Sequence, residues 1–246
     1  DNYTMPFSLL QYEVGLLVKV QTLLLLPYSS IILFLAVYMF YFHKIPSFIQ
    51  KVYNQRQWQV NAEDKSLFLT FDDGPHPSLT PKILDLLSKF RAKVTFFQLG
   101  SKIEAYPSLH RRCLDEGHAV GNHGYYHLDS VKTPLKEFIN NIEYGALTSN
   151  STLYRPAFGR LPLRRKKEIL NKYNVVMWDI MPGDFDIKQD TKSCVKVLKN
   201  NVTRGSIIVL HENERAKDKV IDILEWVLKK YSKEGYQFCG LDPYHI

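Results

Sequence analysis

Cysteine is scarce in this sequence: only three occur among the 246 residues, at positions 113, 194 and 239. None of them belongs to a CxxC pair or to another metal-binding spacing, and their number is odd. The sequence therefore indicates neither a disulfide framework nor a cysteine-based zinc site, and we expect Cys113 and Cys239 to be buried thiols. Repeats and low-complexity stretches are also absent, and 45% of the residues are hydrophobic, which suffices for one complete core.

Acidic residues are outnumbered, with 25 Asp and Glu against 32 Lys and Arg, which gives a net charge of +7. Part of the basic excess lies between Arg164 and Tyr173, in RRKKEILNKY. No nucleic-acid-binding motif accompanies it, so we interpret it as the solvated face of a helix and expect no nucleic-acid partner. A mild attraction to acidic glycans or to an anionic membrane surface stays open.

One long apolar run lies near the N-terminus, from Leu23 to Phe42, and its 20 residues carry no formal charge. A helix of that length matches a bilayer core, although Pro27 interrupts the run, so membrane association is one interpretation. More basic residues follow the run than precede it closely, which by the positive-inside rule would place the rest of the chain in the cytoplasm. The run could also be an uncleaved signal or envelope anchor, or an upstream extension of a protein that starts at Met39.

Beyond residue 65, short apolar segments alternate with helical patterns. We predict seven strands, at Leu67–Phe71, Val94–Leu99, Ala119–Asn122, Leu153–Arg155, Val175–Trp178, Ile207–Leu210 and Tyr236–Cys239. We expect helices between them, at Pro81–Phe90, Pro107–Glu116, Pro134–Leu147, Leu163–Tyr173, Thr191–Val202 and Arg215–Lys233. This alternation predicts an α/β fold with parallel strands, either a barrel or an open doubly wound sheet. The chain then divides into a hydrophobic segment (1–43), a linker (44–64) and one α/β domain (65–246).

Ionisable residues follow five of these strands. In SLFLTFDDGP, an apolar strand ends in two adjacent carboxylates, which repel each other unless a partner uses them. Because ligands bind at the carboxyl ends of parallel strands, we expect the ionisable residues that follow the strands to share one site. They are Asp72, Asp73, His123, His127, Arg155, Asp184 and His211.

Two of these residues, His123 and His127, have the spacing of a metal site, because one helical turn would place both imidazoles on one side. Two histidines and a carboxylate leave a position open for water, as catalytic zinc sites do. A divalent metal also accounts for the paired aspartates: one binds the metal and the other stays free as a base. The metal would lower the pKa of its bound water toward about 7. The alternative interpretations are ordinary surface histidines for the histidine pair and a turn or helix cap before Gly74 for the two aspartates.

The remaining ionisable residues suit supporting roles. Taken by itself, His211 would be interpreted as a core histidine. Asp184 could, however, orient its ring and favour its protonated form, which a general acid that protonates a leaving amine needs. Arg155 could be a structural ion-pair partner, or it could hold Asp72 in its ionised form.

The segments LTFDDGP, NHGYYH, RPAFGR, WDIMPGDFD and IVLH resemble, in this order, the five motifs of the NodB-type polysaccharide deacetylases, carbohydrate esterase family 4. The resemblance covers about 175 residues, from Lys65 to Cys239. It implies a distorted (β/α) barrel with seven strands. It also implies metal-dependent removal of N- or O-acetyl groups from glycans such as chitin oligosaccharides, peptidoglycan or xylan.

The resemblance also implies roles for individual residues. Asp72 would be the catalytic base, oriented by Arg155, and His211 the catalytic acid, tuned by Asp184. The implied metal ligands are Asp73, His123 and His127. A backbone N–H near Phe158 would join the metal in stabilising the oxyanion, a contribution of about 3–4 kcal/mol per donor. The implied substrate-binding residues are Phe158, Phe185 and Trp178.

Several positions depart from the family pattern. Gly124 stands where a Ser or Thr hydroxyl usually braces the metal-site loop, so we expect a looser site that still binds metal. Four further positions differ, and those around the acetyl pocket put the identity of the substrate in doubt. They are Ala157, Phe158, Phe185 and Val209.

The sequence thus predicts a metal-dependent hydrolase that removes N-acetyl groups from an amino-sugar glycan of the chitin or peptidoglycan type. Its cofactor would be Zn²⁺ first, with Co²⁺, Ni²⁺ or Mn²⁺ also able to accept two imidazoles and a carboxylate. The alternatives are a related amide hydrolase with a small substrate, a glycan-binding pseudoenzyme that uses its aromatic residues for stacking, and a membrane scaffold. The intact ionisable set speaks against all three.

Overall fold

The computed structural model describes residues 43–161 and 166–241. The chain separates into two units, residues 1–41 and 42–246, and only the second contains described residues. The apolar run from Leu23 to Phe42 lies outside the described residues. Within the described ranges, no helix is both long and apolar enough to cross a membrane.

A parallel sheet forms the centre of the domain, and each predicted strand overlaps one of its members. The strands are β1 (Ser66–Asp72), β2 (Thr95–Gln98), β3 (Ala119–Asn122), β4 (Leu153–Tyr154), β5 (Asn174–Val175), β6 (Ile207–His211) and β7 (Gln237–Phe238). Their order is β5-β4-β3-β2-β1-β6, and β7 pairs with β1. A bridge from Ile180 to Ile208 connects the segment after β5 with β6. The sheet therefore curls into a distorted (β/α) barrel with seven strands.

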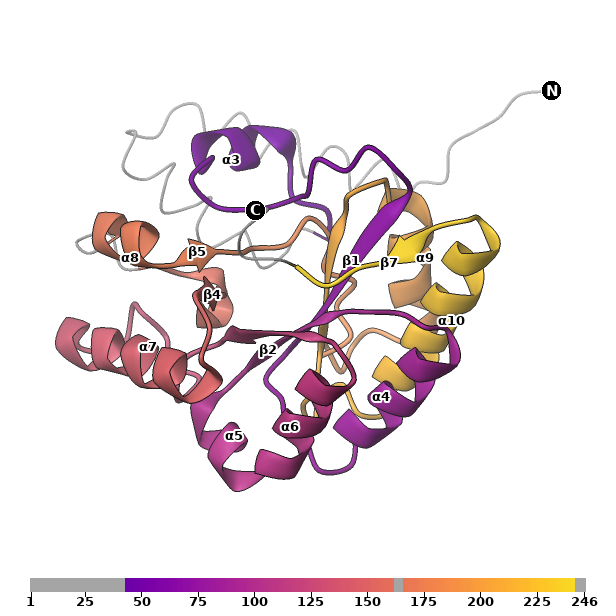
Figure 1. Ribbon diagram of the computed structural model, residues 1–246. Coiled ribbons are helices and arrows are strands. Elements are labelled where there is room, and N and C mark those ends of the chain that lie inside the picture. The colour runs from indigo at the N-terminus through magenta and orange to yellow at the C-terminus, as the bar shows by residue number, and fades with distance from the viewer. Residues whose placement is uncertain (1–42, 162–165, 242–246) are drawn as a thin grey trace. The chain divides into compact units, whose positions relative to one another are not determined.

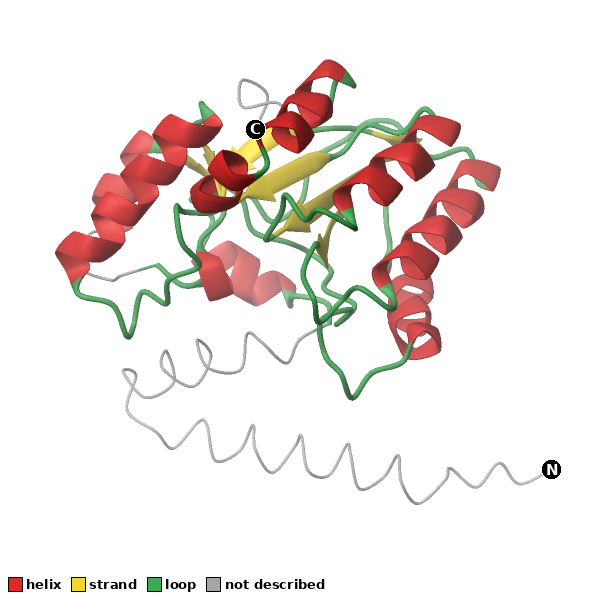
Figure 2. Ribbon diagram, turned by 90° about the horizontal axis from the view of Figure 1, so that it is seen from below, coloured by secondary structure: helices red, strands yellow, loops and turns green. Residues whose placement is uncertain are grey.

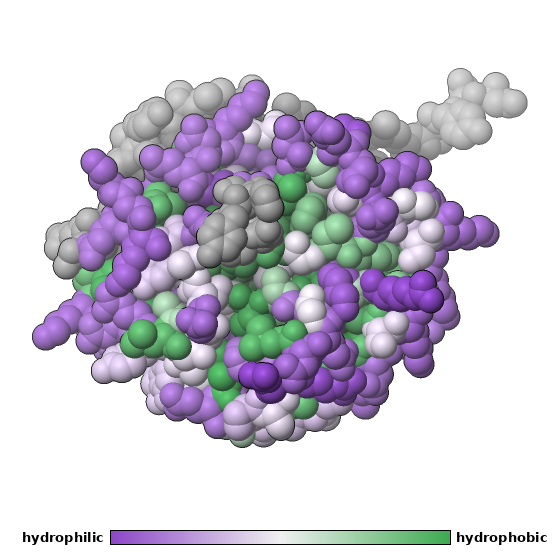
Figure 3. Space-filling view, viewed as in Figure 1, coloured by the Kyte–Doolittle hydropathy of each residue, from purple (hydrophilic) through white to green (hydrophobic). Residues whose placement is uncertain are grey.

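Helices surround this sheet on its outside. They are α3 (Ser47–Val52), α4 (Thr80–Lys89), α5 (Gly100–Ala105), α6 (Pro107–Asp115), α7 (Leu135–Ser149), α8 (Lys166–Lys172), α9 (Thr191–Asn201) and α10 (Val220–Lys233). Neighbours in space are α9 with α10, α10 with α4, α4 with α6, α6 with α5 and α5 with α7 (Figures 1 and 2). On the face in Figure 3, hydrophilic side chains dominate the periphery and hydrophobic ones gather toward the middle.

Two helices were not predicted and one begins late. The helices α3 and α5 have six residues each, too few for a hydrophobic period to be recognised. The helix expected from Arg215 begins at Val220. The reason is local: the Asn213 side-chain oxygen accepts hydrogen bonds from the backbone N–H groups of Arg215 and Ala216, each at 3.0 Å, which holds a turn.

The strand β1 lies in the core of the domain. All seven of its residues are buried, and it pairs with β2 on one side and with β6 on the other. Its apolar side chains join those of α4 and α10 in one hydrophobic cluster, which includes Leu69, Ile83 and Ile223. Burial on both faces explains why β1 reads as a continuous apolar run rather than an alternating one. The rigid strand ends at Asp72 and thereby fixes the position of that carboxylate.

The segment expected as a linker, residues 44–64, packs against the domain. Ile45, Ile49 and Trp58 are at most 4% exposed. The Lys44 ammonium lies 2.6 Å from the buried Asp179 carboxylate. The sequence of this segment does not predict these contacts, because its three buried apolar residues are spread over 14 positions without a helical or strand period.

Candidate active site

The carboxyl ends of β1 and β6 place Asp72 and His211 next to each other. The two residues are register partners in the parallel pair of strands. Asp72 is 4% exposed, and the His211 side chain is 15% exposed. The loops after β3, β4 and β5 bring the other predicted residues to the same end of the sheet.

Arg155 lies fully buried behind Asp72, and acceptors engage all three of its side-chain nitrogens. Its Nη1 donates to Asp72 Oδ1 at 2.8 Å and to Thr70 Oγ1 at 2.6 Å. Its Nε and Nη2 donate to the backbone oxygens of Val176 and Met177 at 3.2 and 2.7 Å. Burial lowers the pKa of Arg155, and the charge of Asp72 opposes that shift. This ion pair fixes one oxygen of Asp72 and leaves the other for chemistry.

A potential metal site lies beside this pair, formed by Asp73, His123 and His127. Asp73 Oδ1 lies 3.5 Å from His123 Nε2 and 3.4 Å from His127 Nε2. In a tetrahedral site with ligand bonds of about 2.0–2.2 Å, neighbouring ligand atoms lie about 3.3–3.6 Å apart. Each histidine therefore lies from the Asp73 oxygen at the spacing of zinc-type ligands, and the three ligand atoms all lie within 4.8 Å of one another.

The hydrogen bonds around these side chains also fit a metal. Asp73 Oδ1 is buried and has no hydrogen-bond partner among the described residues, whereas its Oδ2 accepts from Asn213 Nδ2 at 2.7 Å. His123 Nδ1 lies 2.8 Å from the carbonyl oxygen of Arg155. A carbonyl can only accept, so Nδ1 carries the proton and Nε2 can present a lone pair toward Asp73. A cation between Oδ1 and Nε2 would satisfy both atoms.

The electrostatics around Asp73 and His127 favour the protonation states that bind a metal. Burial alone would raise the pKa of Asp73, but its interactions with His123, His211 and His127 outweigh burial and hold that pKa well below its usual range. Burial, together with the neighbouring His123, lowers the pKa of His127. An ionised carboxylate and neutral imidazoles are the forms that bind metal.

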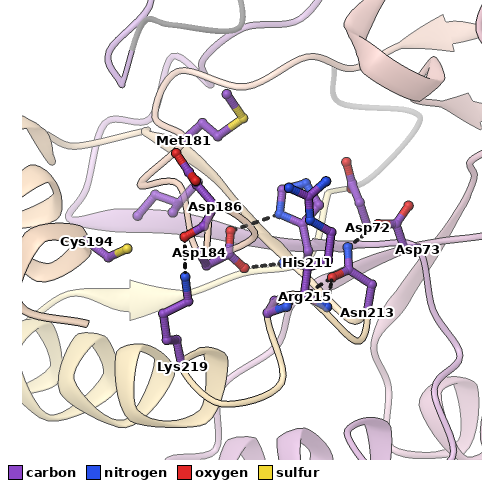
Figure 4. A network of polar contacts seen from close by, with 12 residues as sticks. Asp72, Asp73, Met181, Asp184, Asp186, Cys194, His211, Asn213, Arg215 and Lys219 are labelled. Atoms are coloured by element: carbon purple, nitrogen blue, oxygen red, sulfur yellow. Dashed lines mark hydrogen bonds and ion pairs between the residues drawn. The ribbon is translucent and has the colours of Figure 1, made fainter. Parts of the chain in front are cut away.

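On the other side of Asp72, His211 is paired with Asp184. Asp184 Oδ1 lies 2.9 Å from His211 Nδ1, and its Oδ2 accepts from the backbone N–H of His211 at 2.7 Å (Figure 4). Burial lowers the pKa of His211, but Asp184, followed by Asp73 and Asp72, overrides it and raises that pKa to about 9. The imidazole is thus held in place at Nδ1, and Nε2 remains for proton transfer.

Comparisons with known proteins identify the family of the chain. The family model described as Polysaccharide deacetylase matches residues 59–178. A peptidoglycan-N-acetylglucosamine deacetylase of Bacillus cereus is 30% identical over 74% of this chain and 88% of its own. The chain belongs to the polysaccharide deacetylase family.

Two further matches support this membership. A chitooligosaccharide deacetylase of Azorhizobium caulinodans is 31% identical over 63% of this chain and 77% of its own. Among solved structures, a peptidoglycan N-acetylglucosamine deacetylase matches with a TM-score of 0.73 and 27% identity, over 80% of this chain and 95% of that one.

The loop that carries both histidines of this deacetylase-family domain is not helical, contrary to the spacing argument. The segment after β3 contains bends instead, and the rings of His123 and His127 lie 5.3 Å apart. Asn141 of α7 holds the loop through both atoms of its amide, at 2.7 Å from the N–H and 2.8 Å from the oxygen of Tyr126. The Asn122 side chain accepts from the N–H of Gly124 at 2.7 Å. These amides brace the loop that the family pattern braces with a Ser or Thr hydroxyl at position 124.

The three aromatic residues predicted to bind substrate differ in their surroundings. The ring of Phe158 is 38% exposed and lies 4.4 Å from that of His127. The ring of Phe185 lies 4.8 Å from that of His211. Trp178 is only 5% exposed, and its Nε1 is buried with no hydrogen-bond partner in the part of the chain that the structure describes, so it can contribute an N–H donor but little stacking surface. Phe158 and Phe185 thus lie beside His127 and His211, respectively.

Sequence reasoning missed three polar residues of the site. Asn213 binds Asp73, and the Lys102 ammonium donates to the backbone oxygen of Asp73 at 2.7 Å. Glu212 is fully buried, and burial raises its pKa to about 8. A Cβ atom at Gly74 would lie 1.9 Å from Glu212 Oε2, which explains the glycine after the paired aspartates. Only the position of Glu212 and Asn213 directly after His211 could have pointed to them.

Proposed function

We propose that this protein is a metal-dependent deacetylase that removes N-acetyl groups from an amino-sugar glycan of the peptidoglycan or chitin oligosaccharide type. The observation that carries the proposal is the arrangement of a three-ligand metal site, an Arg-paired aspartate and an Asp-paired histidine at one end of the sheet. Relatives named for peptidoglycan and chitooligosaccharide deacetylation support the substrate class.

Asp73, His123 and His127 would hold the metal, and Zn²⁺ is the first candidate because two imidazoles and a carboxylate suit it. Co²⁺, Ni²⁺ and Mn²⁺ accept the same ligands. When bound, the metal supplies a Lewis acid that activates water and draws charge from the acetyl carbonyl.

Asp72 is the proposed base. Its Oδ1 is occupied by Arg155, while its Oδ2 has no hydrogen bond within the described residues, so Oδ2 is the atom that would take the proton from water. His211 is the proposed acid: Asp184 holds Nδ1, and Nε2 would give its proton to the leaving amine. The backbone N–H of Phe158 is the proposed oxyanion donor, and the rings of Phe158 and Phe185 would line the acetyl pocket.

Acetate release tests this function. The full chain in neutral detergent would be treated with EDTA and assayed on chitin oligosaccharides and on peptidoglycan fragments, without metal and after addition of zinc or cobalt. We expect metal-restored release with at least one substrate, and none from a matched Asp73→Asn variant. A folded, metal-loaded protein that releases no acetate from either glycan would contradict the proposal.

We also propose that the apolar run from Leu23 to Phe42 associates the protein with a membrane. Sedimentation of cell membranes tests this: the protein should stay in the pellet after a high-salt wash and leave it with detergent. Release by salt alone would contradict it.

A further inference from the structure

A cavity lined mainly by polar residue types lies away from the proposed catalytic residues. It has a volume of about 470 Å³ and is lined by residues between Ser47 and Ala62, together with Arg204. Arg204 precedes the start of β6, whereas the catalytic residues follow the ends of strands. Among the described residues that line it, Lys51, Arg56 and Arg204 are cationic, none is acidic, and none belongs to the candidate active site.

The most unusual of these residues is Arg56. It is 8% exposed, its Nε is buried without a partner, and its side chain donates no hydrogen bond within the described ranges. Its guanidinium lies only over the ring of Tyr53, 4.6 Å from the ring centre. Arg155, which is fully buried, has acceptors on all three nitrogens. A buried guanidinium without an acceptor is costly, so Arg56 points to an anion that completes its surroundings.

A second cation, Lys166, adds to the positive charge beside Arg56. The ammonium of Lys166 lies over the same Tyr53 ring, 5.0 Å from its centre. Burial lowers the pKa of Arg56, and burial together with repulsion by Arg56 lowers the pKa of Lys166. Two cations therefore share one aromatic ring, and within the described residues no carboxylate pairs with either of them, an arrangement that an anion would stabilise.

We propose that this cavity binds a phosphate-bearing ligand, with Arg56 as its buried anchor and Lys51 and Arg204 at its mouth. Phosphate fits because it offers several acceptors and more than one charge, and the planar guanidinium binds it through two parallel hydrogen bonds. The exposed amides of Asn54 and Asn61 also border the cavity and can donate to a phosphate ester. The ligand could be a lipid headgroup or a soluble phosphate, since the lining begins five residues after the apolar run that ends at Phe42.

Calorimetric titration tests the proposal. The full chain in neutral detergent would be titrated with inorganic phosphate at constant ionic strength. We expect binding by the native chain and by the control Arg91→Gln, which removes an exposed arginine elsewhere. Arg56→Met should weaken binding about tenfold or more, because it removes charge-assisted hydrogen bonds. Equal affinity of Arg56→Met and the native chain would overturn the proposal.

Flotation with vesicles then separates the two sources. Phosphatidylcholine vesicles with and without phosphatidic acid would be compared for the native chain and Arg56→Met. A gain in binding from phosphatidic acid that Arg56→Met abolishes identifies a lipid headgroup, whereas phosphate binding without that gain identifies a soluble ligand. If neither phosphate nor phosphatidic acid binds in an Arg56-dependent way, the proposal is wrong.

A second variant tests the proposal even if Arg56→Met does not fold. Lys51→Gln combined with Arg204→Gln alters only exposed side chains and should also weaken phosphate binding. Unchanged affinity in this double variant, with the fold intact, would equally overturn the proposal.

Discussion

Asp72 and His211 are register partners on the neighbouring strands β1 and β6, so the proposed base and acid extend from one edge of the sheet. Asp73, the next residue along, has a φ of 75° and turns away to meet His123 and His127. The two adjacent carboxylates of the FDDGP segment therefore belong to different groups of residues. One carboxylate is paired with the Arg155 guanidinium and the other lies against His123 and His127, so the two adjacent aspartates have separate partners.

This division predicts different consequences for the two aspartates. Asp72→Asn should retain metal affinity while the catalytic constant falls by about 10²–10⁴, the usual contribution of a general base. Asp73→Asn should weaken metal binding by more than the roughly 10–100-fold that loss of an outer-shell partner costs. Metal titration by calorimetry and acetate release measure the two effects separately.

Thermal unfolding provides the control, because Asp72→Asn leaves the buried Arg155 without its charge partner and should lower stability. Both assays must therefore be run below the unfolding temperature of that variant. Full turnover by Asp72→Asn would show that another group is the base.

The strands, and the gathering of the ionisable residues that end or follow them, could be predicted from the sequence because both depend on local signals. The strand β1 is a continuous apolar run, and Asp72 stands directly at its end. The brace of the metal-site loop could not be predicted, because Asn141 lies on α7 and meets Tyr126 only after the helix packs. The partner of Asp73 was equally hidden: Asn213 is 140 residues away in the chain.

The loop after β3 is shaped for glycine at position 124. Gly124 has a φ of 89°, and a Cβ there would lie 2.6 Å from Asn141 Nδ2 and 3.0 Å from the Tyr126 oxygen. Gly124→Ser should therefore weaken metal binding and cost about 1–3 kcal/mol of stability, even though it restores the residue type usual in the family. Metal titration and thermal unfolding would measure both effects.

Gly235→Ser is the matched control, because Gly235 has a φ of 81° but nothing within 4 Å of its Cβ position. It should cost stability through strain and leave metal affinity unchanged. Tighter metal binding by Gly124→Ser would mean that the hydroxyl braces the loop as it does in the family pattern.

The segment 44–64 is expected to contribute to folding stability. Ile49 of α3 is 2% exposed, whereas its neighbour Phe48 is 52% exposed. Ile49→Ala should lower the free energy of unfolding by about 2–5 kcal/mol, since it leaves a cavity in a packed interface. Phe48→Ala should change it by no more than about 0.5 kcal/mol. Chemical denaturation of both variants distinguishes a docked segment from a loose linker, for which the two substitutions would be equally mild.

A buried histidine far from the active site makes stability depend on pH. The His118 side chain is 2% exposed, and its Nδ1 accepts from the backbone N–H of Val94 at 3.3 Å. Burial, then repulsion by Lys93 and Arg112, outweighs attraction by Glu116 and lowers the pKa of His118 from 6.5 to about 4. The folded protein therefore keeps this imidazole neutral at a pH where the unfolded chain protonates it.

Between pH 6.5 and about 4 the unfolded state binds more protons than the folded state, so stability falls as the pH is lowered through that window. The stabilisation is complete above pH 6.5 and amounts to about 3 kcal/mol, at 1.36 kcal/mol per pH unit. His118→Gln keeps an acceptor for Val94 but cannot titrate, so its free energy of unfolding should fall less steeply over the same range. Denaturant unfolding at several pH values measures both slopes, and parallel profiles for the two proteins would show that His118 does not titrate between the folded and unfolded states.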